Sequence, residues 1–274
     1  MAQRVLAATA VTSLHYTALG DSGPRVVFLH GLFGQGRNWS TVAKALSPHA
    51  RVLLVDLPNH GRSPWTDHFA YREMAGQVAD LLQADGGGAA YAVVGHSMGG
   101  KVAMTLALLH RGVVARLAVV DVSPVPTGQI SHFARYVDGM RSLDLDTLAD
   151  RSQAEAELIP YVSDPDVRSF LLQNLRRARP PEKGWRWQMN LDLLGDQLDQ
   201  MGGWPDLAAP PYPGPVLWLA GAKSSYVRPD YAPAMRALFP RVRLVTIKDA
   251  GHWLHSDQPT VFLSVLRRFL HLPA

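Results

Sequence analysis

The stretch that decides the fold is Gly95-His96-Ser97-Met98-Gly99, which has the form Gly-x-Ser-x-Gly and lies where a strand gives way to a helix. The apolar run Ala89–Gly95 before it has the length and composition of a buried strand. Gly100–His110 after it repeats apolar residues at helical spacing. The pattern predicts a tight turn in which small residues leave room for the backbone and the Ser97 hydroxyl stands clear. The helix start would direct free N–H groups at the same spot, where negative charge can be held.

The composition is that of an ordinary globular protein. The chain has 274 residues, of which 47% are hydrophobic and 18% charged, so it fits one large α/β domain or one domain with an insertion. No apolar run reaches the roughly 20 residues that span a bilayer, and the apolar run near the start is too short for a signal peptide. We therefore expect a cytoplasmic protein with no membrane partner. The absence of Cys excludes disulfides, thiol catalysis and Cys-ligated zinc.

The formal net charge is +4, and the basic residues are spread along the chain. The one tight group is Arg176, Arg177 and Arg179. No interleaved aromatic residues and no helix-turn-helix pattern accompany this group, so it is interpreted as a solvated helix face and not as a nucleic-acid site.

Short apolar runs alternate with helical patterns along most of the chain. Six near-continuous Val/Leu/Ile runs predict buried strands of the parallel type: Val26–His30, Arg51–Asp56, Tyr91–Gly95, Leu117–Val122, Val216–Ala220 and Val242–Ile247. Helical patterns lie between them, at Trp39–Leu46, Ala70–Ala84, Gly100–His110, Ala232–Leu238 and Pro259–Leu270. The alternation predicts an α/β fold with a mostly parallel sheet and helices on both faces. Arg4–Val11 and Leu14–Leu19 are candidates for an antiparallel hairpin at the start.

One interval, from Val122 to Val216, breaks the alternation and carries helical patterns only. One such pattern is Ile130, Phe133, Val137 and Met140, and another begins at Asp164-Pro165 as N-cap and first helical residue, with Val167, Leu171 and Leu175 aligned. Residues 125–210 are therefore predicted to form a helical cap, inserted after the sixth strand of a core made by residues 1–124 and 211–274. Trp185, Trp187 and Met189 either form the core of this cap or wall a pocket above Ser97.

A serine nucleophile needs a base, and the base needs an acid that orients it. His252 is the best base, because its loop follows the last predicted strand and would emerge at the same sheet edge as Ser97. The usual place for the acid, residues 221–226, holds no carboxylate, and the first one beyond is Asp230. Asp121, at the carboxyl end of the preceding strand, is the preferred acid over Asp230 and Asp249. The alternative is that Asp121 caps a local turn with Ser123-Pro124.

Two backbone N–H groups should form the oxyanion hole. One is predicted from Met98, directly after the nucleophile, and the other from Leu32, with Phe33 as second choice. The glycines of this second loop have the wrong spacing for a dinucleotide-binding loop, and no Walker Lys-Ser/Thr follows. No cluster has metal-ligand spacing. The expectation is a site with neither cofactor nor metal.

The motifs taken together resemble the α/β-hydrolase superfamily over nearly the whole chain. Within it, the chain is similar to the YbfF-type bacterial esterases and the ABHD11-like hydrolases. The resemblance rests on HGLFG at 30–34, NHGRSP at 59–64, GHSMGGK at 95–101, DVSP at 121–124, SYV at 225–227 and AGHWLH at 250–255. In those esterases the acid follows the sixth strand and a serine occupies the usual acid position. The resemblance therefore implies Asp121 as acid, Ser224 as an accessory group, and ester hydrolysis without a cofactor.

These expectations combine into a serine carboxylesterase that acts on short- to medium-chain esters through an acyl-enzyme. The expected partner is a small-molecule ester, and the expected state is a monomer or small homo-oligomer. The residues expected to line the substrate pocket are Phe33, Trp185, Trp187, Met189, Tyr226 and Trp253. A thioesterase, C–C hydrolase or perhydrolase on the same fold remains an alternative. So does a binding protein with a vestigial triad.

Overall fold

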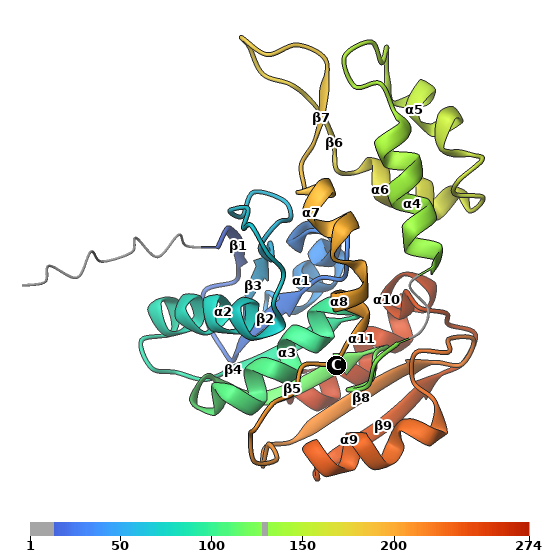
Figure 1. Cartoon of the computed structure of the whole chain (residues 1–274). Helices are drawn as coiled ribbons and strands as arrows, with labels where there is room; N and C mark the ends of the chain where they lie inside the picture. The colour runs from blue at the N-terminus through green and yellow to red at the C-terminus, as the bar shows by residue number, and fades with distance from the viewer. Residues whose placement is uncertain (1–13, 128–130, 274) are drawn as a thin grey trace, which may run out of the picture.

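A seven-stranded sheet forms the centre of the molecule, with strand order β1-β3-β2-β4-β5-β8-β9 (Figure 1). The computed structural model describes residues 14–127 and 131–273. The strands are β1 (Tyr16–Leu19), β2 (Arg25–Leu29), β3 (Arg51–Val55), β4 (Tyr91–His96), β5 (Val114–Val120), β8 (Val216–Gly221) and β9 (Val242–Ile247). The mostly parallel sheet predicted from the six apolar runs is confirmed, because β2 to β9 in this sheet pair in parallel.

The antiparallel edge strand is β1, which pairs with β3 so that Tyr16 lies opposite Val55. It corresponds to the predicted strand Leu14–Leu19. The other half of the predicted hairpin, Arg4–Val11, lies outside the described residues.

Helices cover both faces of the sheet, because successive side chains of a buried strand point to opposite faces. Val27 and Leu29 of β2 join the core beneath α2 (Tyr71–Gly86), α3 (Met98–Leu109) and α9 (Ala232–Leu238). Val26 and Phe28 of the same strand join the core beneath α1 (Ser40–Leu46) and α11 (Pro259–Leu270). A 3₁₀ turn at Gly36–Trp39 precedes α1, and a short helix, α10 (Leu254–Asp257), precedes α11.

The insert, residues 125–210, separates β5 from β8 in the chain and rises beyond one edge of the sheet (Figure 1). Its helices are α4 (Ser131–Ser142), α5 (Arg151–Leu158), α6 (Pro165–Leu172), α7 (Leu191–Asp196) and α8 (Leu198–Gly202). The predicted N-cap is present, since the Asp164 side chain accepts a hydrogen bond from the Asp166 N–H at 2.8 Å. Ile130 of the first helical pattern lies outside the described residues.

The insert is not purely helical, which corrects the prediction. Two strands, β6 (Leu175–Arg177) and β7 (Trp185–Trp187), form an antiparallel pair with Leu175 opposite Trp187. Leu175 therefore begins a strand and does not continue α6, which ends at Leu172. Arg176 and Arg177 belong to this strand, so their interpretation as a helix face was wrong. Segments this short pair through contacts between residues far apart in the chain, and helical periodicity does not report such contacts.

The position of the insert also needs a correction. It leaves the sheet after β5, which is the fourth parallel strand along the chain and not the sixth. The predicted count included β1, which is antiparallel, and Arg4–Val11, which lies outside the described residues.

Candidate active site

Ser97 occupies a strained turn between β4 and α3, with φ 53° and ψ −120°. A side chain on Gly95 would lie 2.3 Å from the Gly99 carbonyl oxygen, and one on Gly99 would lie 2.4 Å from the His30 carbonyl oxygen. Only glycine fits at either position, so the turn depends on both glycines of the motif. Such strain persists where the surrounding structure enforces it, and it is typical of functional sites.

His252 and Asp121 come together although they are 131 residues apart in the chain. His252 Nδ1 lies 2.8 Å from Asp121 Oδ2. Asp121 is fully buried and has φ 50°, at the point where the chain leaves β5. Its other oxygen accepts a hydrogen bond from the Gly221 N–H at 3.0 Å. A buried carboxylate needs such partners, because removing it from water without them would be costly.

Ser224 lies where the resemblance implied, since its hydroxyl donates a hydrogen bond to the same Asp121 oxygen that His252 contacts. The two other candidate acids lie elsewhere. Asp230 is 56% exposed and pairs with Arg228, and Asp249 is 59% exposed and lies 3.9 Å from the Lys223 ammonium. The structure therefore brings Asp121, and neither of these two, to His252.

Two backbone N–H groups near Ser97 are free to bind an anion. Within the described part of the chain, neither the Leu32 N–H nor the Met98 N–H has an acceptor. The second choice, the Phe33 N–H, donates instead to His60 Nε2 at 3.2 Å. This contact leaves Leu32 as the available donor of that loop.

Three buried side chains hold the Leu32 loop in place. His30 Nδ1 lies 2.8 Å from the Gly31 carbonyl, and His60 accepts from Phe33 as described. Asn174, which lies between α6 and β6 of the insert, donates from its amide to the Phe33 carbonyl at 2.7 Å. Burial lowers the pKa of His30, and it lowers that of His60 to about 3. Both imidazoles are therefore neutral near pH 7, as the acceptor role of His60 requires.

Two further histidines surround His252, and sequence reasoning missed their roles. His96 Nε2 lies 2.8 Å from the His252 carbonyl oxygen, so it ties the His252 loop to the Ser97 turn. Burial lowers the pKa of His96, and it lowers that of His255 to about 4. His255 stacks on Trp39 with ring centroids 4.3 Å apart. His96 was visible inside the Ser97 motif, but no sequence signal pointed to its partner.

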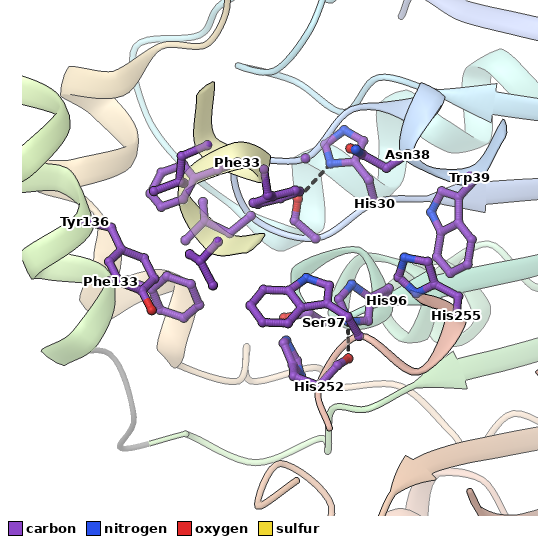
Figure 2. Close-up of a pocket in the computed structure, with 17 residues that line it drawn as sticks. His30, Phe33, Asn38, Trp39, His96, Ser97, Phe133, Tyr136, His252 and His255 are labelled. Carbon is purple, nitrogen blue, oxygen red and sulfur yellow. Dashed lines mark hydrogen bonds between the residues drawn. The ribbon is translucent and has the colours of Figure 1, made fainter. Parts of the chain in front are cut away.

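Ser97 faces two adjoining cavities. The first is lined by Ser97 and His252 from the core and by Phe133, Tyr136 and Phe170 from the insert. Figure 2 shows Ser97 beside His96 and His252 on one side of it, with Phe133 and Tyr136 projecting from the insert on the other.

The second cavity shares Ser97, Leu32 and Phe133 with the first. Met98, Lys101, Tyr226 and Met201 of α8 also line it. Ser97 thus lies between two mainly apolar cavities.

Three of the six predicted pocket residues line these cavities and three do not. Phe33 and Trp253 line the first cavity and Tyr226 the second, where its ring stacks on His252 with centroids 4.2 Å apart. Trp185, Trp187 and Met189 lie in the core of the insert itself. The indole N–H of Trp185 donates to the Leu148 carbonyl at 2.8 Å, and that of Trp187 lies 3.3 Å from the Met140 carbonyl. Trp185 and Trp187 are two residues apart on β7, so they share one face of that strand, and this face packs toward the core of the insert.

Lys101, one helical turn after Ser97, fastens α8 to the core. Its ammonium donates to the carbonyls of Gly202 and Gly203 at 2.8 and 2.7 Å and lies 3.3 Å from that of Met201. The Tyr71 hydroxyl also donates to Met201, at 2.6 Å. Burial lowers the pKa of Lys101 to about 7. The motif GHSMGGK contained this lysine, but its acceptors are a hundred residues away in the chain.

Among residues 14–127 and 131–273, no group of three His, Asp or Glu side chains is placed to hold a metal ion. In the same ranges, every helix is too short or too polar to cross a bilayer.

Comparison with known proteins agrees with this fold. A family model described as the alpha/beta hydrolase fold matches residues 24–259. The chain belongs to the α/β-hydrolase family. The mouse protein "sn-1-specific diacylglycerol lipase ABHD11" is 41% identical over 94% of this α/β hydrolase and 85% of its own length. "Esterase YbfF" of Escherichia coli is 31% identical over 90% and 92% of the two chains.

A solved structure also resembles this α/β hydrolase closely. The "Marine microorganism esterase" superposes with a TM-score of 0.90 and 31% identity, covering 94% of this chain and 99% of its own. These relatives confirm the predicted fold class and family resemblance. Their names also bear out the prediction of a carboxylic ester hydrolase.

Proposed function

We propose that this α/β hydrolase is a serine carboxylesterase in which Ser97 is the nucleophile, His252 the base and Asp121 the acid. The observation that carries the proposal is the 2.8 Å contact between His252 Nδ1 and the buried Asp121 carboxylate, beside the strained Ser97 turn. Asp121 holds the imidazole so that Nε2 is free to take the Ser97 proton.

The proposed reaction has two halves. The Ser97 oxygen attacks the ester carbonyl carbon while His252 takes the hydroxyl proton, and the Leu32 and Met98 N–H groups hold the oxyanion. The C–O bond to the alcohol then breaks, and His252 gives its proton to the departing alcohol. Water repeats the sequence on the acyl-enzyme, with His252 as base, and releases the carboxylic acid and Ser97.

The insert is proposed to act as the cap that selects the substrate. Phe133, Tyr136 and Phe170 line the first cavity, and Leu198 and Met201 line the second. The mainly apolar lining of both cavities supports an ester with an apolar, short- to medium-chain acyl group. One methylene in an apolar pocket changes specificity by roughly 1–3 kcal/mol.

A glycerolipid ester is a second candidate substrate, because a specific group in the second cavity favours it. Within the described residues, the buried Tyr226 hydroxyl has no hydrogen-bond partner. A substrate oxygen next to the scissile ester would satisfy it, and the mouse relative is named as a diacylglycerol lipase. A plain alkyl ester offers no such oxygen.

The test is a panel of p-nitrophenyl esters from acetate to palmitate, together with a diacylglycerol dispersion. The proposal expects a burst of p-nitrophenol with the butyrate ester and a maximum rate below about ten acyl carbons. Faster turnover of the diacylglycerol would favour the lipid ester, and Tyr226→Phe should then slow that substrate alone. Absence of turnover with every ester would contradict the esterase. A cytoplasmic location and the oligomeric state stay predictions.

A further inference from the structure

A groove rich in arginine lies between the β6–β7 pair of the insert and the core loops that follow β2 and β3. It encloses about 1070 Å³ and is separate from the two cavities at Ser97. Six arginines line it: Arg37 and Arg62 from the core, and Arg176, Arg177, Arg179 and Arg186 from the insert. We call this the arginine groove. Nothing in the proposed ester chemistry uses it.

The positive charge of the arginine groove is not balanced by its own residues. Asp56 is the one carboxylate in its described lining. That carboxylate already accepts the N–H groups of Gly36 at 2.8 Å and Arg62 at 2.9 Å, and it lies 3.0 Å from His15 Nδ1. Within the described part of the chain, none of the six guanidinium groups lies within 4.0 Å of a carboxylate oxygen.

The guanidinium groups are close enough to disfavour one another's charge. Burial and the charge of Arg151 lower the pKa of Arg37, the Asp56 carboxylate raises it, and the charge of Arg62 lowers it by a smaller amount. Burial, followed by the charges of Arg37, Arg151 and Arg62, lowers that of Arg176. Repulsion between neighbouring guanidinium groups raises the free energy of the folded protein. A bound anion would offset this repulsion.

Three of the arginines are held in position with donors to spare. Arg176 Nε donates to the Gln188 side chain at 2.9 Å, and Arg37 donates to the Gln173 carbonyl at 2.6 Å. Arg177 donates to the Ala149 carbonyl at 2.9 Å, and its guanidinium lies 4.7 Å from the centroid of the Trp185 ring. Each of these contacts uses part of a guanidinium that carries five N–H donors in a planar fork.

The side chains of the other three arginines have no hydrogen-bond partner among the described residues. These three, Arg62, Arg179 and Arg186, are exposed. Guanidinium groups with unused N–H donors match phosphate, which accepts paired N–H donors on adjacent oxygens.

We propose that the arginine groove binds a phosphate-bearing anion, with guanidinium groups of the core on one side and of the insert on the other. The anion would lie on the opposite side of the segment 31–38 from Ser97, because Gly31 to Gly34 and Asn38 line the first cavity while Gln35 and Arg37 line the groove. It would bridge core and insert beside the Asn174–Phe33 hydrogen bond. A soluble phosphate compound and the headgroup of an anionic phospholipid share this chemistry.

The variant Arg62→Gln/Arg186→Gln tests the proposal, because it removes two charges and breaks no described side-chain hydrogen bond. Arg72→Gln/Arg236→Gln is the matched control, since both residues are exposed, on α2 and α9, and outside the groove. Titration calorimetry with sodium pyrophosphate at 50 mM NaCl measures the soluble source. Flotation with phosphatidylcholine vesicles, with and without 20 mol% phosphatidic acid, measures the lipid source.

At least one probe should bind the wild-type protein, and the groove variant should bind it at least 10-fold more weakly while the control binds normally. Pyrophosphate binding alone indicates a soluble ligand, and flotation that requires phosphatidic acid indicates a lipid headgroup. Arg179→Gln gives a milder second variant, and Ser97→Ala should bind as wild type does. The proposal is overturned if neither probe binds, or if the control variant loses as much affinity as the groove variant.

Discussion

The loops at the carboxyl edge of the sheet and the insert meet around Ser97, but they are held by different kinds of constraint. The Ser97 turn requires glycine at positions 95 and 99, because a side chain there would clash with the carbonyl oxygens of Gly99 and His30. The insert has no such local determinant. It is positioned by hydrogen bonds from far along the chain, from Lys101 to Gly202 and from Asn174 to Phe33.

This difference matches the separate roles proposed for the two regions, catalysis at the sheet edge and substrate selection in the insert. The groups proposed to make and break bonds lie in loops at the carboxyl edge of the sheet. A small displacement of such a group would lower the rate of the reaction. The insert lines part of both cavities beside Ser97, and a change of side chain there would alter cavity shape and leave the strands undisturbed. Substitutions in the two regions should therefore differ in size and kind.

The largest effect is expected from Ser97→Ala. The change removes the proposed nucleophile and very little packing, so ester hydrolysis should fall by about 10⁴–10⁶-fold while the melting temperature stays near that of the wild type. Turnover of p-nitrophenyl butyrate and thermal unfolding measure the two quantities. A folded variant that kept a tenth of the activity would show that another residue is the nucleophile.

Asp121→Asn should come next, with kcat lower by about 10³–10⁴-fold. The amide keeps the shape of the carboxylate but loses its charge, and it favours the wrong tautomer of His252. Asp230→Asn and Asp249→Asn are the controls, because both side chains are exposed and distant from His252. Near-normal turnover by Asp121→Asn, with either control inactive, would reverse the assignment.

Most of the sheet and the proposed acid were predictable because their signals are local. Apolar runs of five or six residues marked every parallel strand, and α9 and α11 begin and end where the patterns predict. A charged residue at the end of an apolar strand, Asp121, needed a buried partner, and His252 supplies it.

The insert was less predictable because its contacts are long-range. Trp185 and Trp187 looked like pocket residues, but a three-residue strand turns both toward the insert's own core. No sequence motif predicts which carbonyl groups accept the hydrogen bonds of Asn174 and Lys101. Asparagine and lysine are common surface residues, and only the fold shows that these two are buried.

Acid should destabilise the sheet edge, because His30, His60, His96 and His255 are buried there with lowered pKa values. Below pH 6.5 the unfolded chain binds protons at these residues. In the folded chain, His255 is protonated only near pH 4 and His60 only near pH 3. The free energy of unfolding should therefore fall as pH falls through this window, by about 1.4 kcal/mol per pH unit for each such histidine.

Urea unfolding at pH 7, 6 and 5 measures this slope. His255→Leu removes one of the four groups. It should reduce the pH dependence of the unfolding free energy by about 1.4 kcal/mol per pH unit. A free energy of unfolding that stays constant from pH 7 to 5 would contradict the account of neutral buried histidines.

A smaller effect should mark the contact between the two regions. Asn174→Ala removes the amide that holds the Phe33 carbonyl, so the Leu32 N–H should lose its fixed position and kcat should fall by about 10-fold. Asn190→Ala is a matched control, because the Asn190 side chain also joins the insert to a core loop, through the Asn59 side chain at 3.2 Å and the Thr66 carbonyl at 3.3 Å. Equal losses of kcat in the two variants would mean that the contact serves stability alone.

The smallest effect is expected within the sheet edge itself, at Ser224. Its hydroxyl donates to the Asp121 oxygen that also contacts His252, so Ser224→Ala should cost about 1 kcal/mol, or roughly 5-fold in kcat. Ser123→Ala is the control, since its hydroxyl donates to the Tyr226 carbonyl at 3.0 Å and leaves Asp121 untouched. A loss of 10³-fold at Ser224 would place it among the essential groups. A loss at Ser123 as large as at Ser224 would mean that both serines act only by holding the loop that carries Tyr226.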